Sequence, residues 1–187
     1  MFLGGFNHPP NVDAVETFLA EIWPLLRARA PSASFVVAGA DLPDRLRARE
    51  GEGVTMAGHV ADLATLFRCC RVSVAPLRFG AGQKGKIVTS LSHGVPVVTT
   101  SVGAESMGLV HGETAMLADD PGRFAECVHR LMVDDELWMR LSDAGLSHVS
   151  AAFDYGQVRD KLAGLLDMLG LVSPRQLARP PGRRIAA

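Results

Sequence analysis

The chain has 187 residues, the length of one compact domain, and its 48% hydrophobic and 21% charged residues are typical of a globular protein. A formal net charge of -1 gives no electrostatic basis for binding nucleic acid or an anionic membrane. Because Met1 leads straight into FLGGFNHPP without a basic signal-peptide region, and no apolar run approaches the ~20 residues of a membrane helix, we expect a soluble cytoplasmic protein.

Short apolar runs alternate with amphipathic stretches along the first part of the chain. Asn11 is the expected N-cap of the first helix, and Pro24 should kink that helix because it cannot donate to the carbonyl of Ala20. In chain order we expect a strand at 1–6, a helix at 11–30, a strand at 34–40, a helix at 42–49, a strand at 53–60, a helix at 62–70, a strand at 72–77, a helix at 84–94 and a strand at 95–101.

The last part of the chain has a different pattern. One short strand is predicted at 115–119, followed by helices at 121–133, 135–152 and 155–169. The final segment, SPRQLARPPGRRIAA, has four Arg, three Pro and no acidic residue. We therefore predict one domain over 1–170 and a disordered basic tail over 171–187, with an RNA-binding arm as the alternative for the tail.

Strands that are apolar along their whole length and flanked by helices predict a parallel sheet covered on both faces. The predicted fold class is therefore α/β, a Rossmann-like doubly wound sheet. Ligands of such sheets bind at the carboxyl ends of the strands. The loops of interest follow those ends and read GFNHPP, GADLP, GHVAD, LRFGAGQKGK and TTSVGAES.

The loop RFGAGQKGKI at 78–87 comes within one residue of a phosphate-binding P-loop. Ile87 stands where a P-loop has the Ser or Thr that holds Mg²⁺, and the loop follows the fourth predicted strand instead of opening the sheet. Asp119 is a weak candidate for the metal-binding acid of such a site. An NTPase is therefore the least favoured interpretation.

The same loop nevertheless has the features of an anion site. Gly80, Ala81 and Gly82 let a ligand approach the backbone closely, and they lead into the free N–H groups and positive dipole end of the next helix. Lys84 and Lys86 add mobile positive charge at the same mouth. A solvated glycine-rich turn is the alternative, but the combination of strand, glycines, lysines and helix favours diphosphate binding.

Four segments, FNHPPNVDAV, FVVAGADLP, VTMAGHVADL and VSVAPLRFGAGQKGKIVTSLSHGVPVVTTSVGAESM, resemble in their order the C-terminal half of GT-B glycosyltransferases of the group 1 or family 4 class. The resemblance covers residues 1–169, and its most specific part is 76–107. It implies a Rossmann-like domain that binds the nucleotide of a sugar nucleotide, while a separate N-terminal half holds the acceptor. It also implies transfer that retains the anomeric configuration and needs no metal or cofactor.

The resemblance assigns residues to the donor site. It places the Gly-Ala-Gly loop at the donor diphosphate, two basic positions at the leaving phosphate and an acidic position near the donor. The loops around Gly39 and Gly58 are similar to segments that surround the base and ribose, and the residue after the first strand faces the interdomain cleft. The site residues that we predict are Asn7, His59, Gly80, Ala81, Gly82, Lys84, Lys86, Thr89 and Glu105.

Thr89 departs from the family pattern, which has Glu at this position, five residues before Gly94. A carboxylate there would hold both ribose hydroxyls, whereas Thr89 offers one neutral hydroxyl. The loss of one charged hydrogen bond is worth ~1.5–3 kcal/mol, so we expect weaker ribose binding.

The chain begins at the first strand of the family's second half. We expect the acceptor-binding N-terminal half in the same or another chain, so that this chain alone binds the donor without catalysing transfer. The alternative is a non-catalytic binding or assembly module that kept the fold and lost the site. Polysaccharide or glycolipid assembly is the pathway that the resemblance suggests, while the base, the sugar and the acceptor stay open.

Other chemistries have little support in the sequence. The six histidines show no HExxH or paired ligand spacing, although His8 also lies on a ligand-side loop, and no GxSxG elbow is present. GGFNHPPN is not GxGxxG, which argues against a dehydrogenase. The three cysteines form neither a CxxC pair nor a disulfide framework, so we expect reduced thiols.

Overall fold

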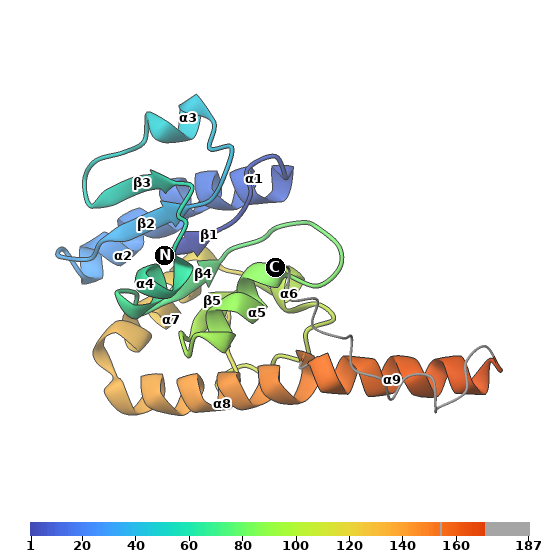
Figure 1. The fold of residues 1–187 in the computed structure, drawn as a ribbon. Coiled ribbons are helices and arrows are strands. Elements are labelled where there is room, and N and C mark those ends of the chain that lie inside the picture. Colours follow the sequence, from blue (N-terminus) through green and yellow to red (C-terminus); the bar gives the residue numbers. More distant parts are fainter. Residues whose placement is uncertain (154, 171–187) are drawn as a thin grey trace, which may run out of the picture. The chain divides into compact units, whose positions relative to one another are not determined.

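The computed structural model describes residues 1–153 and 155–170, which fall into two compact units, Met1–His148 and a second that begins at Val149. All strands of the described residues belong to the first unit (Figure 1). In the second unit the structure describes the end of helix α8, Asp135–Phe153, and helix α9, Tyr155–Met168. The predicted tail over 171–187 lies outside the described residues. None of the helices in these two ranges is both long and apolar enough to cross a membrane.

Six short parallel strands form the centre of the first unit. Two three-stranded sheets, β1-β2-β3 and β4-β5-β6, meet where the N–H of Val74 donates to the carbonyl of Met1 at 2.8 Å. The resulting order 3-2-1-4-5-6 is that of a Rossmann fold, which confirms the predicted doubly wound α/β class. The strands are β1 Phe2–Leu3, β2 Phe35–Ala38, β3 Val54–Gly58, β4 Ser73–Ala75, β5 Val97–Thr99 and β6 Met116–Leu117.

Each strand is shorter than the sequence predicts, yet the backbone stays paired beyond the strand ends. After β1, the N–H of Gly4 donates to the carbonyl of Ala38 at 3.0 Å, and that of Phe6 donates to the carbonyl of Ala40 at 2.9 Å. The chain therefore runs beside β2 up to the loop that leads into the first helix. This loop lies at the carboxyl edge of the sheet, where ligands of such folds bind.

The first predicted helix consists of three segments, α1 Pro9–Thr17, the π-helical segment η1 Phe18–Ile22 and α2 Trp23–Arg29. The interruption follows from Pro24, which has no N–H for the carbonyl of Ala20, and the N–H of Trp23 instead reaches the carbonyl of Phe18.

The prediction that Asn11 caps this helix is wrong. The helix begins at Pro9, with His8 in an extended conformation as its N-cap, because prolines in the first turn sacrifice no intrahelical hydrogen bond. Asn11 consequently lies inside the helix, where its side chain is buried. This position directs the amide toward the interior of the unit and not toward the backbone N–H groups of the first turn.

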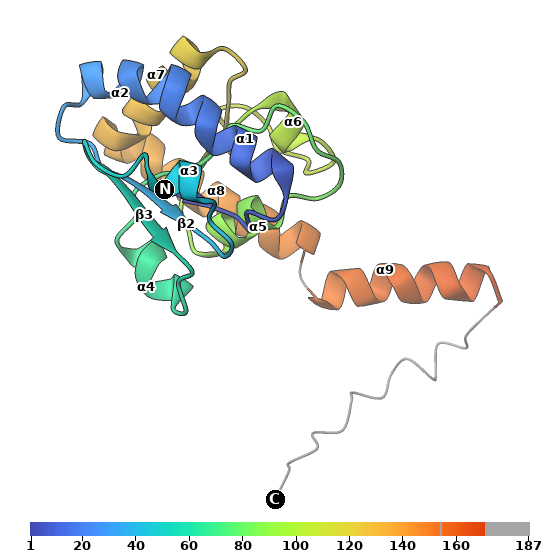
Figure 2. The ribbon, with the colours of Figure 1, turned by 90° about the horizontal axis from the view of Figure 1, so that it is seen from above.

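Helices cover both faces of the sheet (Figure 2). On one face lie α1, α2 and α7 (Pro121–Val133), and on the other lie α4 (Leu63–Arg68) and α5 (Gly85–Ser92). Phe18, Phe35 and Phe124 pack within the larger core, and Phe67 joins Met1 and Val95 in a smaller cluster. The single-turn helix α6 lies in a segment that the sequence predicts as a loop. The remaining bounds are α3 Asp44–Arg47 and α6 Ser101–Ala104.

Candidate functional site

The loop between β4 and α5 lies at the carboxyl edge of the sheet, as predicted. Gly80 at φ 124° and Gly82 at φ 75° adopt backbone conformations that other residues rarely reach. The ammonium of Lys84 donates to the carbonyls of these two glycines, at 3.1 Å and 2.6 Å respectively, and the residue is 7% exposed. The expectation of a mobile charge is therefore wrong for Lys84, because the loop's own carbonyl groups hold its ammonium.

Lys86 lies in the first turn of α5 and extends toward α1. Its ammonium donates to Oδ1 of Asn11 at 2.7 Å and lies 5.4 Å from the centre of the Phe2 ring. No carboxylate among the described residues forms an ion pair with it. Burial, and to a smaller extent the charge of Lys84, lowers the pKa of Lys86 from its ordinary 10.5 to about 8. A bound anion would compensate this charge and favour its protonated form.

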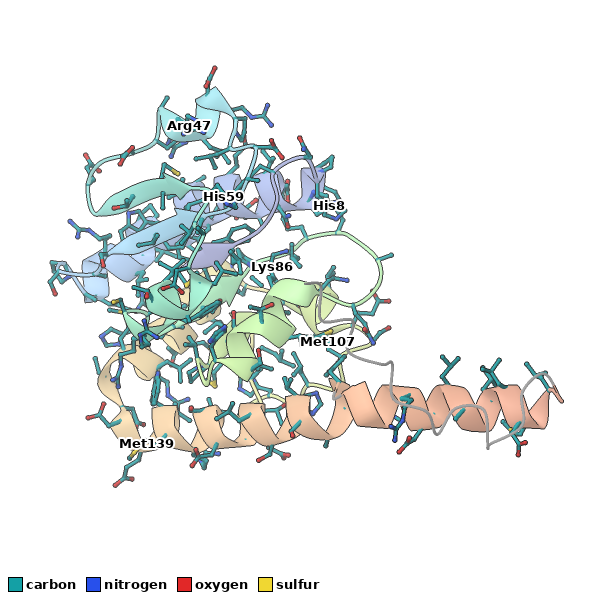
Figure 3. All side chains as sticks on the ribbon, in the orientation of Figure 1. His8, Arg47, His59, Lys86, Met107 and Met139 are labelled. Atoms are coloured by element: carbon teal, nitrogen blue, oxygen red, sulfur yellow. The ribbon has the colours of Figure 1, made fainter. Side chains whose placement is uncertain are left out.

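A cavity of about 170 Å³ opens beside Lys86. Four predicted site residues line it, namely Gly80, Ala81, Lys84 and Lys86. His8 also lines it, and Figure 3 shows His8 and Lys86 on the side of the unit where the β4–α5 loop runs. A glycine-rich backbone, a helix N-terminus and a cation that pairs with no carboxylate of the described residues thus surround one space. This combination has the chemistry that binds phosphate.

The other predicted site residues do not line this cavity, although Gly82 belongs to the same loop. Asn7 donates its side-chain amide to Oδ2 of Asp41 at 2.6 Å, which ties the loop after β1 to the loop after β2. His59 is exposed directly after β3, and Glu105 is exposed at the end of α6. The structure therefore brings together the residues predicted for the phosphates and spreads the rest around the same edge of the sheet.

Thr89 is already engaged within α5. Its hydroxyl donates to the carbonyl of Gly85, one turn earlier, at 2.9 Å. In this rotamer the hydroxyl can accept a hydrogen bond from a ligand but has no proton left to donate. A Glu side chain at this position would not be held in this way, because it has no donor for a helix carbonyl.

Sequence reasoning missed Asn11 and Phe79. Phe79 is 47% exposed, lines the small cavity and also lines a neighbouring one of about 360 Å³. The two carboxylates in that neighbouring cavity, those of Asp13 and Glu16, are paired with arginine side chains. It therefore offers apolar surface without uncompensated negative charge. A large aromatic residue directly before a glycine loop was the signal available in the sequence.

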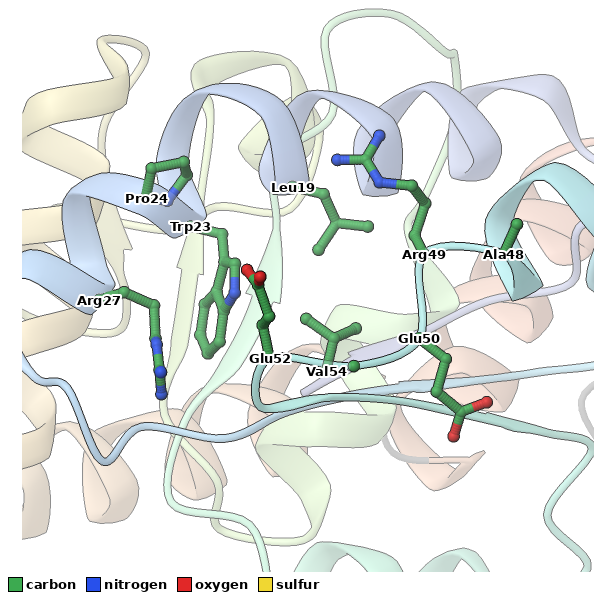
Figure 4. A pocket seen from close by; sticks show the side chains of 10 residues that line it. Leu19, Trp23, Pro24, Arg27, Ala48, Arg49, Glu50, Glu52 and Val54 are labelled. Atoms are coloured by element: carbon green, nitrogen blue, oxygen red, sulfur yellow. The ribbon is translucent and has the colours of Figure 1, made fainter.

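A larger cavity, of about 490 Å³, lies beside the start of β3, and Figure 4 shows the side chains that line it. Trp23 and Arg27 form one side of it, and Glu52, in the tight turn that precedes β3, forms another. It therefore sits at the amino end of a strand, whereas Rossmann-like sheets bind their ligands at the carboxyl ends. We accordingly place the candidate site at the smaller cavity.

In residues 1–153 and 155–170, no three or more His, Cys, Asp or Glu side chains form a group that could hold a metal ion. Asp119, the acid considered for an NTPase, accepts hydrogen bonds from the N–H of Ser101 at 2.8 Å and from its hydroxyl at 3.0 Å. Its carboxylate thus has a local structural partner at the start of α6.

The family model described as glycosyl transferases group 1 matches residues 1–134. A curated relative, an uncharacterised 44.6 kDa protein in the cps region of Klebsiella pneumoniae, is 24% identical over 135 residues. The match covers 67% of this chain and 35% of the relative, so the chain spans about a third of the length of that protein.

Solved structures share the fold of this chain. Anabaena HepE in complex with UDP matches with a TM-score of 0.74 at 17% identity, covering 89% of this chain and 48% of HepE. The C-terminal domain of the group 1 family glycosyl transferase LpcC from Francisella tularensis matches with a TM-score of 0.68 at 16% identity. That match covers 82% of this chain and 85% of the solved domain, whereas the chain spans about half of HepE.

Proposed function

This chain belongs to the group 1 glycosyltransferases and has the fold of their C-terminal GT-B domain, and on this basis we propose that it binds the nucleoside diphosphate of a sugar nucleotide. The sugar would pass to an acceptor held by an N-terminal domain in the same or another chain. The proposed transfer retains the anomeric configuration and needs no metal. Polysaccharide assembly is the proposed pathway, supported by the name of the Klebsiella relative, which places that protein in the cps region.

One observation carries the proposal of diphosphate binding. The side chain of Lys86 is partly buried and its ammonium has no carboxylate partner in the described part of the chain, yet it borders a cavity lined by a glycine-rich loop. The first turn of α5 adds backbone N–H groups and the positive end of its dipole. Burying a lysine charge is unfavourable without compensation, and an anionic ligand supplies that compensation.

The nature of the donor is supported by comparison. HepE, whose fold is similar, was solved in complex with UDP and in complex with UDP-glucose. The chain spans about half of HepE, which supports the proposal that one domain binds the donor and another binds the acceptor. We propose accordingly that this chain binds the donor and is inactive without its N-terminal partner domain.

A thermal-shift titration with UDP, GDP, ADP and dTDP, each with and without Mg²⁺, tests the proposal. A ligand at 100 times its Kd stabilises the folded state by about 2.7 kcal/mol, which is a measurable shift in Tm. We expect a shift with one diphosphate that does not require Mg²⁺, and its loss in Lys86→Ala, whose free form should still unfold in a cooperative transition. A shift that appears only with ADP and only in the presence of Mg²⁺ would favour the NTPase, and no shift with any diphosphate would contradict donor binding.

A non-catalytic binding or assembly module of the same fold is the second candidate function. The observation that favours it is the internal hydrogen bond from Thr89 to Gly85, because this hydroxyl replaces the carboxylate expected to hold the ribose. Such a module would keep the stability of the fold and show no preference among the four diphosphates.

A further inference from the structure

Asn11 occupies an unusual place for an amide side chain, buried inside the first turns of α1 at 5% exposure. Its Nδ2 donates to the carbonyl of Gly5 at 2.6 Å, and its Oδ1 accepts from the Lys86 ammonium at 2.7 Å. We infer that Asn11 is a positioning residue of the proposed donor site, whose neutral amide holds the Lys86 ammonium beside the cavity without cancelling its charge. The inference rests on the proposed function, since it concerns how that site keeps its anion-binding charge.

The geometry makes Asn11 the link between three segments. Its amide joins the loop after β1 to α1 through Gly5, and it joins α1 to α5 through Lys86, which is 75 residues away in the sequence. The packing around it is close, because a Cβ atom on Gly4 would lie 2.8 Å from Nδ2 of Asn11. The amide therefore has little room to rotate, and its two ends are fixed in their donor and acceptor roles.

The charges around Lys86 show why it matters that its hydrogen-bond acceptor, the amide of Asn11, is uncharged. Lys84 on the same loop and His8 at the N-cap of α1 line the same cavity and carry no negative charge. The carboxylate of Asp13, two residues beyond Asn11 on α1, is engaged with the guanidinium of Arg78. Phe2, on the adjoining strand, presents a ring to the ammonium. The positive charge is thus left for a ligand, and the chemistry selects a phosphate or diphosphate.

An aspartate at this position would act differently although it has nearly the same shape. Its carboxylate would still accept from Lys86, but it would neutralise the ammonium and repel an incoming anion. It would also lose the donor to the carbonyl of Gly5. Leucine, which is similar in size, loses both the donor to Gly5 and the acceptor of the Lys86 ammonium and adds no charge, so Asn11→Leu is the uncharged control for Asn11→Asp.

The first readout needs no ligand. The chain has three lysines, Lys84, Lys86 and Lys161, so selectively ¹³C-labelled lysine side chains can be titrated individually by NMR. In Asn11→Asp we expect the pKa of Lys86 to rise from about 8 toward its ordinary 10.5, and in Asn11→Leu we expect no rise. If Asn11 had only a structural role, the pKa of Lys86 would change in the same way in both variants. An unchanged pKa of Lys86 in Asn11→Asp would overturn the inference.

The second readout is the affinity of the full chain for inorganic pyrophosphate, measured by calorimetry at neutral pH. We expect Asn11→Asp to bind it at least about tenfold more weakly than the wild type, and Asn11→Leu to lose less. Equal affinity in the wild type and both variants, or no pyrophosphate binding by the wild type, would overturn the inference. If Asn11→Asp does not fold, Asn11→Leu decides, since an unchanged affinity there would show that Lys86 needs no holder. Failure of all four nucleoside diphosphates alongside pyrophosphate binding would instead contradict only the proposed function.

Discussion

The ammonium of Lys84 lies 2.6 Å from the carbonyl oxygen of Gly82 and 3.1 Å from that of Gly80. The residue thus closes the glycine-rich loop on itself at the mouth of the candidate site. Its neighbour two positions on, Lys86, points to Asn11 instead. The two lysines of the loop therefore have different roles, one shaping the backbone and the other supplying charge to a ligand.

Lys84→Met should loosen the loop and weaken diphosphate binding. Hydrogen bonds from a charged donor contribute about 1.5–3 kcal/mol, so UDP affinity should fall roughly tenfold or more as the loop loses its shape. Hydrogen exchange at Gly80–Gln83 should become faster. Lys161→Met, on an exposed position of α9, is the control and should change neither quantity. Unchanged exchange in Lys84→Met would show that the loop holds its shape without this lysine.

The pH dependence of UDP binding should report Lys86. The pKa of Lys86 is about 8 in the free protein. Its side chain is therefore charged well below pH 8 and loses its proton as the pH rises through this value. Because the diphosphate binds the charged form, affinity should be highest below pH 8 and fall by up to about tenfold per pH unit above it. Calorimetry over this range measures the effect, and it should also detect proton uptake on binding.

Lys86→Arg supplies the control for this pH profile, because a guanidinium keeps its charge throughout. The measurement is best made in a His8→Gln background, since His8 lines the same cavity. The free energy of unfolding should change with pH in the opposite direction to the binding affinity. A lysine whose pKa is lowered on folding destabilises the protein below its folded pKa, and this cost is relieved as the pH rises from about 8 toward 10.5. A flat binding profile in the wild type would contradict the assignment of Lys86.

The fold could be predicted from the sequence because each central strand is apolar along its whole length and each is followed by a helix. The glycine loop could be located for a similar reason, since two glycines between a strand and a helix, with a third at the start of that helix, form a local pattern. The partner of Lys86 could not be predicted in this way. Asn11 is 75 residues away, and the pairing of β1 with the neighbouring strands brings the first turn of α1 close to the first turn of α5, although the two helices cover opposite faces of the sheet (Figure 2).

Two local predictions were wrong for definite physical reasons. Asn11 follows two prolines and resembles a cap, but the prolines themselves fit the first turn of the helix, which moves the cap to His8. Lys84 resembles a solvated lysine, but the left-handed glycines turn their carbonyl groups toward it. Both errors arose where backbone geometry, and not residue type, determines the direction of a side chain.

Thr89→Glu should raise the affinity for UDP if α5 faces the ribose. A carboxylate there can accept from both ribose hydroxyls, and one charged hydrogen bond is worth about 1.5–3 kcal/mol, roughly tenfold or more in Kd. Affinity for pyrophosphate, which has no ribose, should stay the same or fall slightly through charge repulsion. Thr89→Gln is the control of equal length and should gain much less. No gain for UDP in Thr89→Glu would favour the non-catalytic module.

Gly39→Ala should destabilise the first unit, because the backbone after β1 and the backbone after β2 lie very close to each other at Gly4 and Gly39. Gly39 has φ 148°, and a Cβ atom there would lie 1.7 Å from the carbonyl oxygen of Gly4. The backbones at Gly4 and Gly39 would have to separate, which would disturb the hydrogen bond that the N–H of Gly39 donates to the carbonyl of Gly58 at 2.7 Å. We expect a loss of at least about 2 kcal/mol in the free energy of unfolding and a lower Tm.

Gly5→Ala is the matched control for this substitution, since a Cβ atom at Gly5 would meet no atom within 4 Å. It should change the free energy of unfolding by less than about 0.5 kcal/mol in urea titrations of both variants. Equal stability of the two variants would mean that the loops after β1 and β2 can separate at little cost. In that case the carboxyl edge of the sheet would not hold the β1–α1 loop rigidly, and Asn11 would have no fixed carbonyl at Gly5 from which to position Lys86.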